Sequence, residues 1–497
     1  HQDVTGAFIV LARIGYAEAV PETYVLPLEA VSAEQAASRQ ISEPFIPILR
    51  LPDAEGYPGA TLLDALWDRN FCALLLKSIR RRLSFKGHLG ETQSTPTGAF
   101  EHLTGPANRD TGLEPSRLRR EQSNTSVVYG DRLILKFFRR LEEGINLDVE
   151  LGTFLTQRCS FHHVPQVAGD ITYRRGQAPP VSIAFLQEFV QNQGDAWHYT
   201  LRSVDEFLEG ASQHPQSVPG IPEESLFSLA MEDIPTAARR LIGPYLDSAQ
   251  LLGRRTAELH LALASDSEDP SFAPESFSAD YQSSIFQAMT GQAARAFDLL
   301  RDRFNDLPEE AREPAGKALS LEDRVMNQFR PILEREFPAL RIRIHGDFHL
   351  GQVLCANGDF VIIDFEGEPA RPLSERKTKR STLQDVAGML RSFHYAADSA
   401  LLGQAAPVGT KVRDRRVFKA WTGYWQTYVS AAFLSDYLAV VNCKPLLPRG
   451  QEDLEILLQA YQLEKATYEL EYELNNRPRW VSVPLDGILQ ILQHAPL

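Results

Sequence analysis

The stretch RIHGDFHLGQVLCANGDFVIIDFEGEP, residues Arg343–Pro369, decides how this chain is interpreted. It contains Asp347 and Gln352 in a polar segment, and it places Asp364 directly after an apolar run. Carboxylate and amide oxygens are ligands that Mg²⁺ takes from proteins, and a carboxylate can also accept a proton. The stretch therefore predicts a site that handles a proton and a divalent cation.

Phosphoryl transfer needs such groups: a carboxylate that orients the acceptor hydroxyl, ligands for Mg²⁺, and a lysine for the inner phosphates. Asp347 precedes Gln352 by five residues, which is the interval between the base and the metal-binding amide of a kinase catalytic loop. Asp364 stands where the aspartate of the kinase D-F-G motif would stand. The alternative is a silent loop in which Asp347 forms an Asx-turn and Asp364 ends a strand. We predict the catalytic arrangement because all three residues occur in the required order.

The lysine is expected upstream, in RLILKFFRR, where Lys136 ends an alternating apolar strand. Glu150 follows in the amphipathic segment NLDVELGTFL, and we predict that it pairs with Lys136, as a helix glutamate pairs with the strand lysine in kinases. The alternative is that both are solvated charges, one on a strand edge and one on a helix surface.

Two further segments are predicted to contact a nucleotide. EQSNTSVVYGD replaces a G-x-G-x-x-G motif before Lys136, and short polar side chains of this kind leave backbone N–H groups for phosphate oxygens. A plain hairpin turn would look similar. FLQEFVQNQGDAW is typical of a strand that leads through a connector to a helix capped by Asp195. The predicted nucleotide-binding positions are Ser123, Asn124, Thr125, Ser126, and the backbone of Glu188 and Val190.

The composition limits the function classes. The 497-residue chain is 43% hydrophobic and 23% charged, as soluble globular proteins are. Its net charge of −14 argues against nucleic acid or an acidic membrane as the main partner. The four cysteines form no C-x-x-C pair, so neither a zinc site nor a disulfide framework is predicted. With no membrane-spanning run and no recognisable signal peptide, we expect a cytoplasmic protein.

The chain is predicted to have three parts. Residues 1–105 mix short strands and helices, residues 106–192 are strand-rich with a hairpin at Gly130 and Asp131, and residues 193–497 are mainly helical. Strands followed by helices predict the α+β class.

The chain resembles the bacterial maltokinases through several segments, above all DFEGEP followed by RPL and ER, and DVAGMLRSFHYAA. That family transfers the γ-phosphate of ATP to the anomeric hydroxyl of maltose and gives maltose 1-phosphate, which feeds α-glucan synthesis from trehalose. The resemblance implies a bilobal fold like that of eukaryotic protein kinases, with an added N-terminal cap formed by residues 1–105. It also implies Asp347 as the base, Gln352 and Asp364 as Mg²⁺ ligands, and Lys136 as the phosphate-binding lysine.

The sugar site is predicted less sharply. Sugar hydroxyls bind carboxylates, amides and arginine, and the apolar ring face packs on an aromatic side chain, although aromatic residues at helical spacing are more often core. The predicted sugar contacts are His349, Glu366, Glu368, Arg371 and Trp425.

Two alternatives and one partner stay open. A kinase of the same group that acts on glucosamine would share the HGDxHxxQ and DFEGEP segments. A non-catalytic pseudokinase is the second alternative, although it usually lacks the base or a metal ligand. Some maltokinases are fused behind a trehalose synthase domain. The start without Met is compatible with the kinase part of such a fusion, or with association with the synthase, and equally with an expression artefact.

Overall fold

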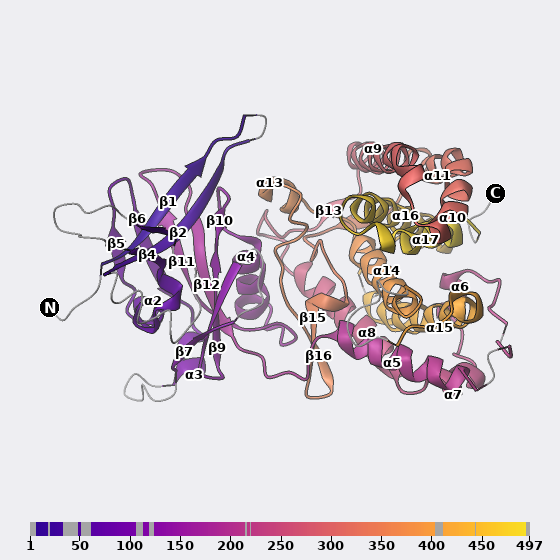
Figure 1. Ribbon diagram of the computed structural model, residues 1–497, viewed down its shortest axis with the longest axis horizontal. Coiled ribbons are helices and arrows are strands. Elements are labelled where there is room, and N and C mark those ends of the chain that lie inside the picture. The colour runs from indigo at the N-terminus through magenta and orange to yellow at the C-terminus, as the bar shows by residue number, and fades with distance from the viewer. Residues whose placement is uncertain are drawn as a thin grey trace. The chain divides into compact units, whose positions relative to one another are not determined.

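The computed structural model describes residues 6–17, 20–32, 48–50, 61–105, 113–118, 124–213, 216–218, 220–402, 411–442 and 444–493. The chain divides into two compact units (Figure 1). Unit 1 comprises residues 1–191 and 369–375, and unit 2 comprises residues 192–368 and 376–497.

Unit 1 is built on two sheets (Figure 1). The first sheet has the order β1-β2-β4-β3, and β10 also pairs with β2. Its strands are β1 (Ala7–Ile14), β2 (Glu22–Val31), β3 (Leu49–Arg50), β4 (Thr61–Asp64) and β10 (Arg140–Leu141). The second sheet has the order β5-β6-β11-β12-β9-β8-β7. Its strands are β5 (Ser84–Lys86), β6 (Glu91–Pro96), β7 (Pro115–Arg117), β8 (Asn124–Tyr129), β9 (Leu133–Phe138), β11 (Val167–Arg174) and β12 (Val181–Glu188).

The β8–β9 hairpin follows from its sequence. Gly130 has a φ of 62° and opens the turn, because glycine adopts the left-handed region without steric cost. In β9, Leu133, Leu135 and Phe137 are fully buried, and the residues between them face the other side of the sheet. The antiparallel register places Ser126 opposite Lys136. The predicted hairpin at Gly130 and Asp131 is therefore confirmed.

The helical elements of unit 1 pack on its sheets. They are η1 (Ala65–Trp67), α2 (Arg69–Arg80), α3 (Phe100–Thr104), α4 (Leu147–Thr153) and a π-helical turn, η2 (Phe154–Arg158). Helix α2 begins after Asp68, whose side chain accepts a hydrogen bond from a backbone N–H. Its Phe71, Leu75 and Ile79 lie four residues apart, so they share one face and enter the core that the second sheet covers. Each such side chain contributes about 1.5–3 kcal/mol by its burial.

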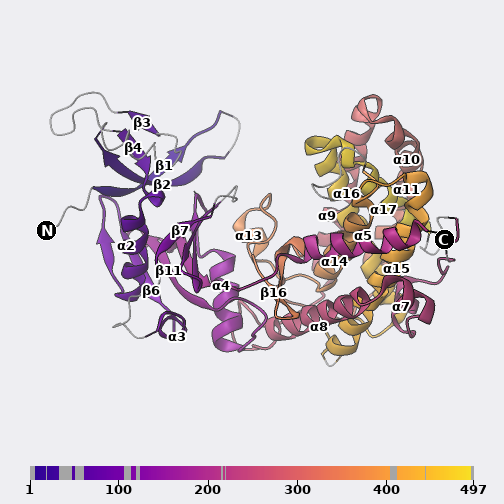
Figure 2. The same ribbon diagram turned by 60° about the horizontal axis from the view of Figure 1, so that its bottom comes forward.

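Unit 2 is mainly helical (Figure 2). Its longer helices are α5 (Ala196–Ala211), α8 (Tyr245–Leu263), α9 (Ala279–Arg303), α10 (Glu309–Ser320), α11 (Glu322–Phe329), α14 (Leu383–Ser399), α15 (Arg415–Val441), α16 (Gln451–Asn476) and α17 (Ser482–Gln493). Shorter helical elements are α6 (Leu226–Ala230), α7 (Thr236–Ile242), α12 (Pro331–Glu334), α13 (Leu373–Arg376), which spans the unit boundary, η3 (Phe304–Asp306), η4 (Leu350–Gln352) and η6 (Pro478–Trp480). Two two-stranded sheets complete the unit: β13 (Glu275–Ser276) with β14 (Leu340–Arg341), and the hairpin of β15 (Val353–Ala356) with β16 (Asp359–Ile362).

Helix α14 lies at the centre of unit 2. Almost all of its residues are buried, and it packs against α5, α15, α16 and α17. A helix that is buried on every face can hold other elements on more than one side. Among the described residues, no helix combines the length and apolar character that crossing a membrane requires.

The architecture agrees with the predicted α+β class, and the division between Gln191 and Asn192 lies beside the junction expected at 192. The sheets do not divide at residue 105, where the border of the expected cap lies. Strands β5 and β6 belong to the same sheet as β11 and β12, and β10 joins the sheet of β1 and β2. Sheet pairing thus crosses the expected border at 105, so the cap stays a prediction.

Candidate active site

The catalytic loop is held by a buried carboxylate. Asp385, in the first turn of α14, accepts hydrogen bonds from the backbone N–H groups of His345 (2.8 Å) and Gly346 (2.9 Å). The ring of His260 lies 3.2 Å from the same carboxylate, which is 1% exposed. A carboxylate that accepts several hydrogen bonds in a dry site fixes the backbone that donates them. The loop is thereby positioned immediately before Asp347.

Helix α14 also approaches the loop closely at Gly388. A Cβ at this position would lie 2.6 Å from the carbonyl oxygen of Phe348, so only glycine allows this packing. One turn later, Ser392 Oγ accepts a hydrogen bond of 3.1 Å from the N–H of Leu350. The loop is therefore fixed on both sides of Asp347.

Asp347 faces a lysine that the sequence did not indicate. Lys465 Nζ, from α16, lies 3.5 Å from Asp347 Oδ1, and His349 Nε2 lies 3.9 Å from Oδ2. Burial acts to raise the pKa of Asp347, but the charges of Lys465, His349 and His345 outweigh it and hold that pKa below its usual value. Asp347 is therefore ionised, and it can accept a hydrogen bond from a hydroxyl group or take up its proton.

The predicted metal ligands flank the β15–β16 hairpin: Gln352 ends η4 directly before it, and Asp364 lies in the loop after it. The backbone carbonyl of Gln352 accepts a hydrogen bond of 2.9 Å from the N–H of Ile363, which ties the two segments together. Asp364 has a φ of 68°, a conformation that costs about 1–3 kcal/mol in a non-glycine residue and that recurs at functional sites. Phe365 is buried as expected, with its ring 4.9 Å from that of His345.

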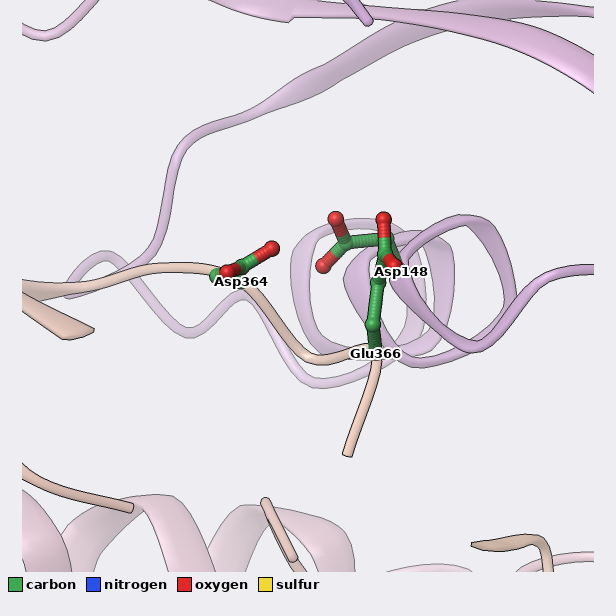
Figure 3. A group of neighbouring side chains, drawn as sticks. All are labelled: Asp148, Asp364 and Glu366. Carbon is green, nitrogen blue, oxygen red and sulfur yellow. The ribbon is translucent and has the colours of Figure 1, made fainter. Parts of the chain in front are cut away.

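Asp364 has a second carboxylate beside it. A carboxylate oxygen of Asp364 and one of Glu366 lie within 4.8 Å of each other (Figure 3). Figure 3 also labels Asp148, which belongs to α4 of unit 1. Hard oxygen donors on one loop suit Mg²⁺, so the residues present fit the predicted cation. Glu366 was predicted as a sugar contact. Its carboxylate lies beside that of Asp364, and its contact with a sugar stays a prediction.

A cavity of about 530 Å³ lies beside the catalytic loop within unit 2. It is lined by residues of the loop, of α14 and of α16, and by Trp480 of η6. Both His349 and Lys465, the neighbours of Asp347, belong to its wall. A volume of 300–1,000 Å³ is typical of small-molecule sites.

The cavity wall combines an aromatic surface with paired charges. Trp480 stacks on Tyr395, with ring centroids 6.1 Å apart and planes 21° apart. Glu469 accepts hydrogen bonds of 2.8 and 2.7 Å from the guanidinium of Arg391, and Glu473 pairs with Arg477. Aromatic faces beside carboxylates are what a sugar ring and its hydroxyls require.

The predicted sugar residues have different outcomes. His349 lines the cavity. Burial and then the charge of Glu368 raise the pKa of Tyr468 in the cavity wall. Burial lowers the pKa of Lys465, but nearby carboxylates that include Glu368 outweigh it and raise that pKa. Trp425 was wrong as a sugar platform, because it is fully buried in the core, 5.2 Å from the ring of Tyr245. Arg371 lies in unit 1 and pairs with Glu375 at 2.8 Å, so its contact with a sugar stays a prediction.

Lys136 has a partner that the sequence prediction did not name. Its Nζ forms an ion pair of 2.8 Å with Asp148, and the expected pairing with Glu150 stays a prediction. Helix positions two residues apart point in nearly opposite directions, so only one of these two acids can face the strand. Asp148 is 3% exposed, and its helix is capped by Asn146, whose side chain accepts a hydrogen bond from the N–H of Asp148.

The predicted phosphate loop is a strand for most of its length. Asn124, Thr125 and Ser126 belong to β8 and pair with β9, so the prediction of a free loop was wrong at these positions. Their backbone groups take part in a ladder because the β-branched run that follows favours a strand. Ser123 lies outside the described residues.

The connector donates to the protein's own backbone. The N–H of Glu188 donates to the carbonyl of Gln166, so this N–H is not available to an adenine edge. Adenine binding by Glu188 and Val190 stays a prediction.

Helix α16 supplies a wall of the cavity that the sequence pattern did not predict. Lys465, Tyr468, Glu469, Tyr472 and Glu473 all line the cavity. They follow an i, i+3, i+4, i+7, i+8 pattern in KATYELEYELNN, which places them on one helical face. A helix face that combines aromatic and charged residues is a signal that could have been noticed, since core faces are apolar.

Known proteins resemble this chain over most of its length. No protein-family model matches it. A glucosamine kinase of Mycolicibacterium smegmatis is 24% identical over 451 residues, which cover 89% of this chain and 92% of that protein. A glucosamine kinase of Streptacidiphilus jiangxiensis is 25% identical over 414 residues, covering 80% of this chain and 77% of that protein. A solved structure of a glucosamine kinase in complex with glucosamine, ADP and inorganic phosphate has a TM-score of 0.62 at 18% identity, and the match covers 98% of this chain and 95% of that one.

The chain has a kinase-like fold. The structural match extends over both units and confirms the bilobal fold class that the sequence predicted. The relatives support the broader group of kinase-like proteins that the sequence indicated, rather than maltokinase in particular.

Proposed function

We propose that this chain is an ATP-dependent kinase that phosphorylates a hydroxyl group of a sugar. The observation that carries the proposal is Asp347, an ionised carboxylate on a fixed loop whose neighbours Lys465 and His349 line a sugar-sized cavity. The kinase-like fold and the relatives named as glucosamine kinases support it.

The proposed mechanism assigns a task to each residue. Asp347 orients the acceptor hydroxyl and takes its proton as the oxygen forms a bond to the γ-phosphorus, while the bond from that phosphorus to the leaving ADP oxygen breaks. Gln352 and Asp364 would hold Mg²⁺ with Glu366 nearby, and the ion, when bound, neutralises charge on the phosphates. Lys136, kept in place by Asp148, would hold the inner phosphates.

Glucosamine is the first candidate for the acceptor. The relatives that cover most of this chain are named glucosamine kinases. A glucosamine kinase was also the alternative that the sequence left open. An amino sugar brings an ammonium group, and the cavity wall contains Glu469 and Glu473. Both carboxylates already pair with arginines, so an ammonium group would share them rather than meet a free charge.

Maltose is the second candidate, and the size of the cavity favours it. An engineered cavity of about 150 Å³ binds benzene, so by that scale 530 Å³ takes about twenty non-hydrogen atoms. Glucosamine has about twelve and maltose about twenty-three, so the volume exceeds what one ring needs. The segments DFEGEP and DVAGMLRSFHYAA, which resemble maltokinase, point the same way. A trehalose synthase that supplies the maltose stays a prediction.

The test is ADP release in the presence of ATP and Mg²⁺ with glucosamine, maltose, glucose and maltotriose as acceptors, followed by ³¹P NMR of the product. Asp347→Asn is the matched control, because it keeps the shape of the side chain and removes its charge. Turnover with one sugar, lost in the variant while ATP still binds, supports the proposal and identifies the acceptor. If no sugar is phosphorylated but ATP binds, the proposal fails and the pseudokinase alternative gains support.

A further inference from the structure

Two histidines of the catalytic loop hold their rings in the same way. His345 Nδ1 lies 3.4 Å from the backbone nitrogen of Asp347, and His349 Nδ1 lies 3.0 Å from that of Gly351. In each case the hydrogen bond comes from the N–H two residues further along the chain. A backbone N–H can only donate, so both Nδ1 atoms accept and carry no proton. Each ring therefore carries its proton on Nε2.

The two Nε2–H groups have different surroundings. His345 is 1% exposed, and its Nε2–H donates to the carbonyl of Ile363 at 3.0 Å. The side chain of His349 is 40% exposed and lines the cavity beside the catalytic loop. Among the described residues its Nε2–H has no acceptor in reach, because Asp347 Oδ2 lies 3.9 Å away, beyond hydrogen-bonding distance. His349 thus presents an unused donor on a side chain that a ligand can reach.

Packing fixes the ring of His349. A Cβ at Gly351 would lie 2.9 Å from Cε1 and 3.0 Å from Nδ1 of His349, so the glycine leaves room for the ring. The carbonyl of His349 also accepts a hydrogen bond of 2.9 Å from the N–H of Gln352. Loss of solvation lowers the pKa of His349 below its usual range, although the charge of Asp347 acts in the other direction. The ring is held in one orientation as a neutral imidazole.

The space between His349 and Asp347 matches one hydroxyl oxygen. An oxygen about 2.7 Å from Oδ2 and about 2.9 Å from Nε2 spans their separation of 3.9 Å with an angle of about 90° between the two hydrogen bonds. That angle is close to the spacing of the hydrogen and the lone pairs around a hydroxyl oxygen. Lys465 lies 3.5 Å from the other oxygen of Asp347, so Oδ2 is the one left for an acceptor.

The neutral ring is compatible with an ionised Asp347. The Nε2–H bond turns its positive end towards Oδ2, and such a dipole favours the charged form of the carboxylate. His349 therefore contributes to the lowered pKa of Asp347 without being protonated on both nitrogens.

We propose that His349 is a second catalytic residue, whose Nε2–H donates a hydrogen bond to the oxygen of the acceptor hydroxyl while Asp347 Oδ2 accepts the hydrogen of that hydroxyl. This role rests on the proposed function. The oxygen is then surrounded by its carbon, its hydrogen, the lone pair that His349 binds and a second lone pair. That second lone pair forms the bond to the γ-phosphorus as the bond from phosphorus to the ADP oxygen breaks. The hydroxyl proton moves to Oδ2, and His349 keeps its own proton and orients the attacking oxygen.

Two substitutions separate this role from that of a structural cap. His349→Asn places an amide oxygen near the position of Nδ1, so it keeps the hydrogen bond from Gly351 and removes the donor. His349→Gln places an amide nitrogen near the position of Nε2, so it keeps a donor and removes the cap. Each variant is the matched control for the other.

The kinetics are measured with ATP, Mg²⁺ and either glucosamine or maltose. In His349→Asn, kcat/KM for the acceptor should fall at least about tenfold, with Tm and the Kd of ATP from calorimetry unchanged. His349→Gln should keep at least about three times the kcat of His349→Asn, with a lower Tm. Normal turnover in His349→Asn combined with a loss in His349→Gln would reduce His349 to a cap. A raised KM for ATP with unchanged acceptor kinetics would place the donor on a phosphate and overturn the assignment.

The position of the proton is measured without turnover. ¹⁵N NMR of the full chain with labelled histidine should show a protonated Nε2 and a bare Nδ1 for His349, whose signals are identified by their loss in His349→Asn. A proton on Nδ1 would overturn the donor whether or not the enzyme is active. A wild-type chain that phosphorylates no sugar would overturn the proposed function and this role with it. A failure of His349 alone is distinct, because it occurs in a chain whose wild type is active.

Discussion

Lys465 is expected to set the pH at which Asp347 works, and Lys465→Met tests this. The lysine ammonium lies 3.5 Å from a carboxylate oxygen of Asp347, and the two side chains are 29% and 23% exposed. Burial raises the pKa of Asp347, whereas Lys465, the largest of the opposing charges, lowers it. Methionine keeps most of the volume of the lysine and removes its charge, so burial should then dominate.

The magnitude follows from the distance. At 3.5 Å and an effective dielectric constant of about 20, two unit charges interact by about 5 kcal/mol. Water reaches both groups, and His349 and His345 remain, so we take about a third of that value as the change. One pKa unit corresponds to about 1.4 kcal/mol, so the pKa of Asp347 should rise by about one unit.

The direction in which Lys465→Met shifts the pH dependence of activity follows from the role of Asp347. The ionised form of Asp347 accepts the proton, so activity is lost as the pH falls through its pKa. Raising that pKa moves the acid limb of the kcat/KM profile upwards by about one pH unit in Lys465→Met, and Lys465→Arg should restore the limb. The measurement is the pH dependence of ADP release with each sugar. An acid limb that stays in place while kcat falls would refute the electrostatic role and leave Lys465 as a sugar contact.

Three further perturbations have defined outcomes. Asp385→Asn should lower the free energy of unfolding by about 3 kcal/mol in urea titrations, because an amide replaces a buried carboxylate that accepts two backbone N–H groups; an unchanged midpoint would contradict the anchoring role. Trp480→Ala should raise the acceptor KM about tenfold with the ATP KM unchanged, whereas Trp425→Phe should lower Tm and leave both KM values alone; the reverse result would restore Trp425 as the sugar platform. Asp364→Asn should raise the Mg²⁺ concentration needed for half-maximal turnover about tenfold or more, and an unchanged requirement would exclude Asp364 as a ligand.

The catalytic loop was predictable because its information is local. The interval between Asp347 and Gln352 and the apolar run before Asp364 lie within one short segment, so the sequence alone defines their order. The hairpin at Gly130 was predictable for the same reason, since a turn residue between two alternating runs specifies it.

The partner of Lys136 was not predictable from pattern. Asp148 and Glu150 are both acids in the first turn of α4, and either would satisfy an ion-pair motif. The choice depends on which side of the helix meets the sheet, and tertiary packing sets that rotation. Similarly, Asn124 and Ser126 have side chains that favour turns, but both residues pair with β9 as part of β8.

The tryptophan side chains considered for the sugar site illustrate a different limit on prediction from sequence. Trp425 and Trp480 are both tryptophans, yet Trp425 fills the core of unit 2 and Trp480 borders a cavity. The first belongs to a long buried helix, and the second follows the proline of a short helical turn. Their roles depend on contacts with Tyr245 and Tyr395, which lie far away in the sequence. No local pattern distinguishes them.

The path of the chain between the two units has a consequence for recombining it with its relatives. Unit 1 is discontinuous, because residues 369–375 belong to it although they follow the catalytic loop and the β15–β16 hairpin in the sequence. A chimaera made with a single crossover at 191 would therefore join a foreign first unit to a native seven-residue insert. Exchange of acceptor or nucleotide preference between homologues should require crossovers at 191, 368 and 375 together, and libraries built on one junction should yield mostly inactive proteins.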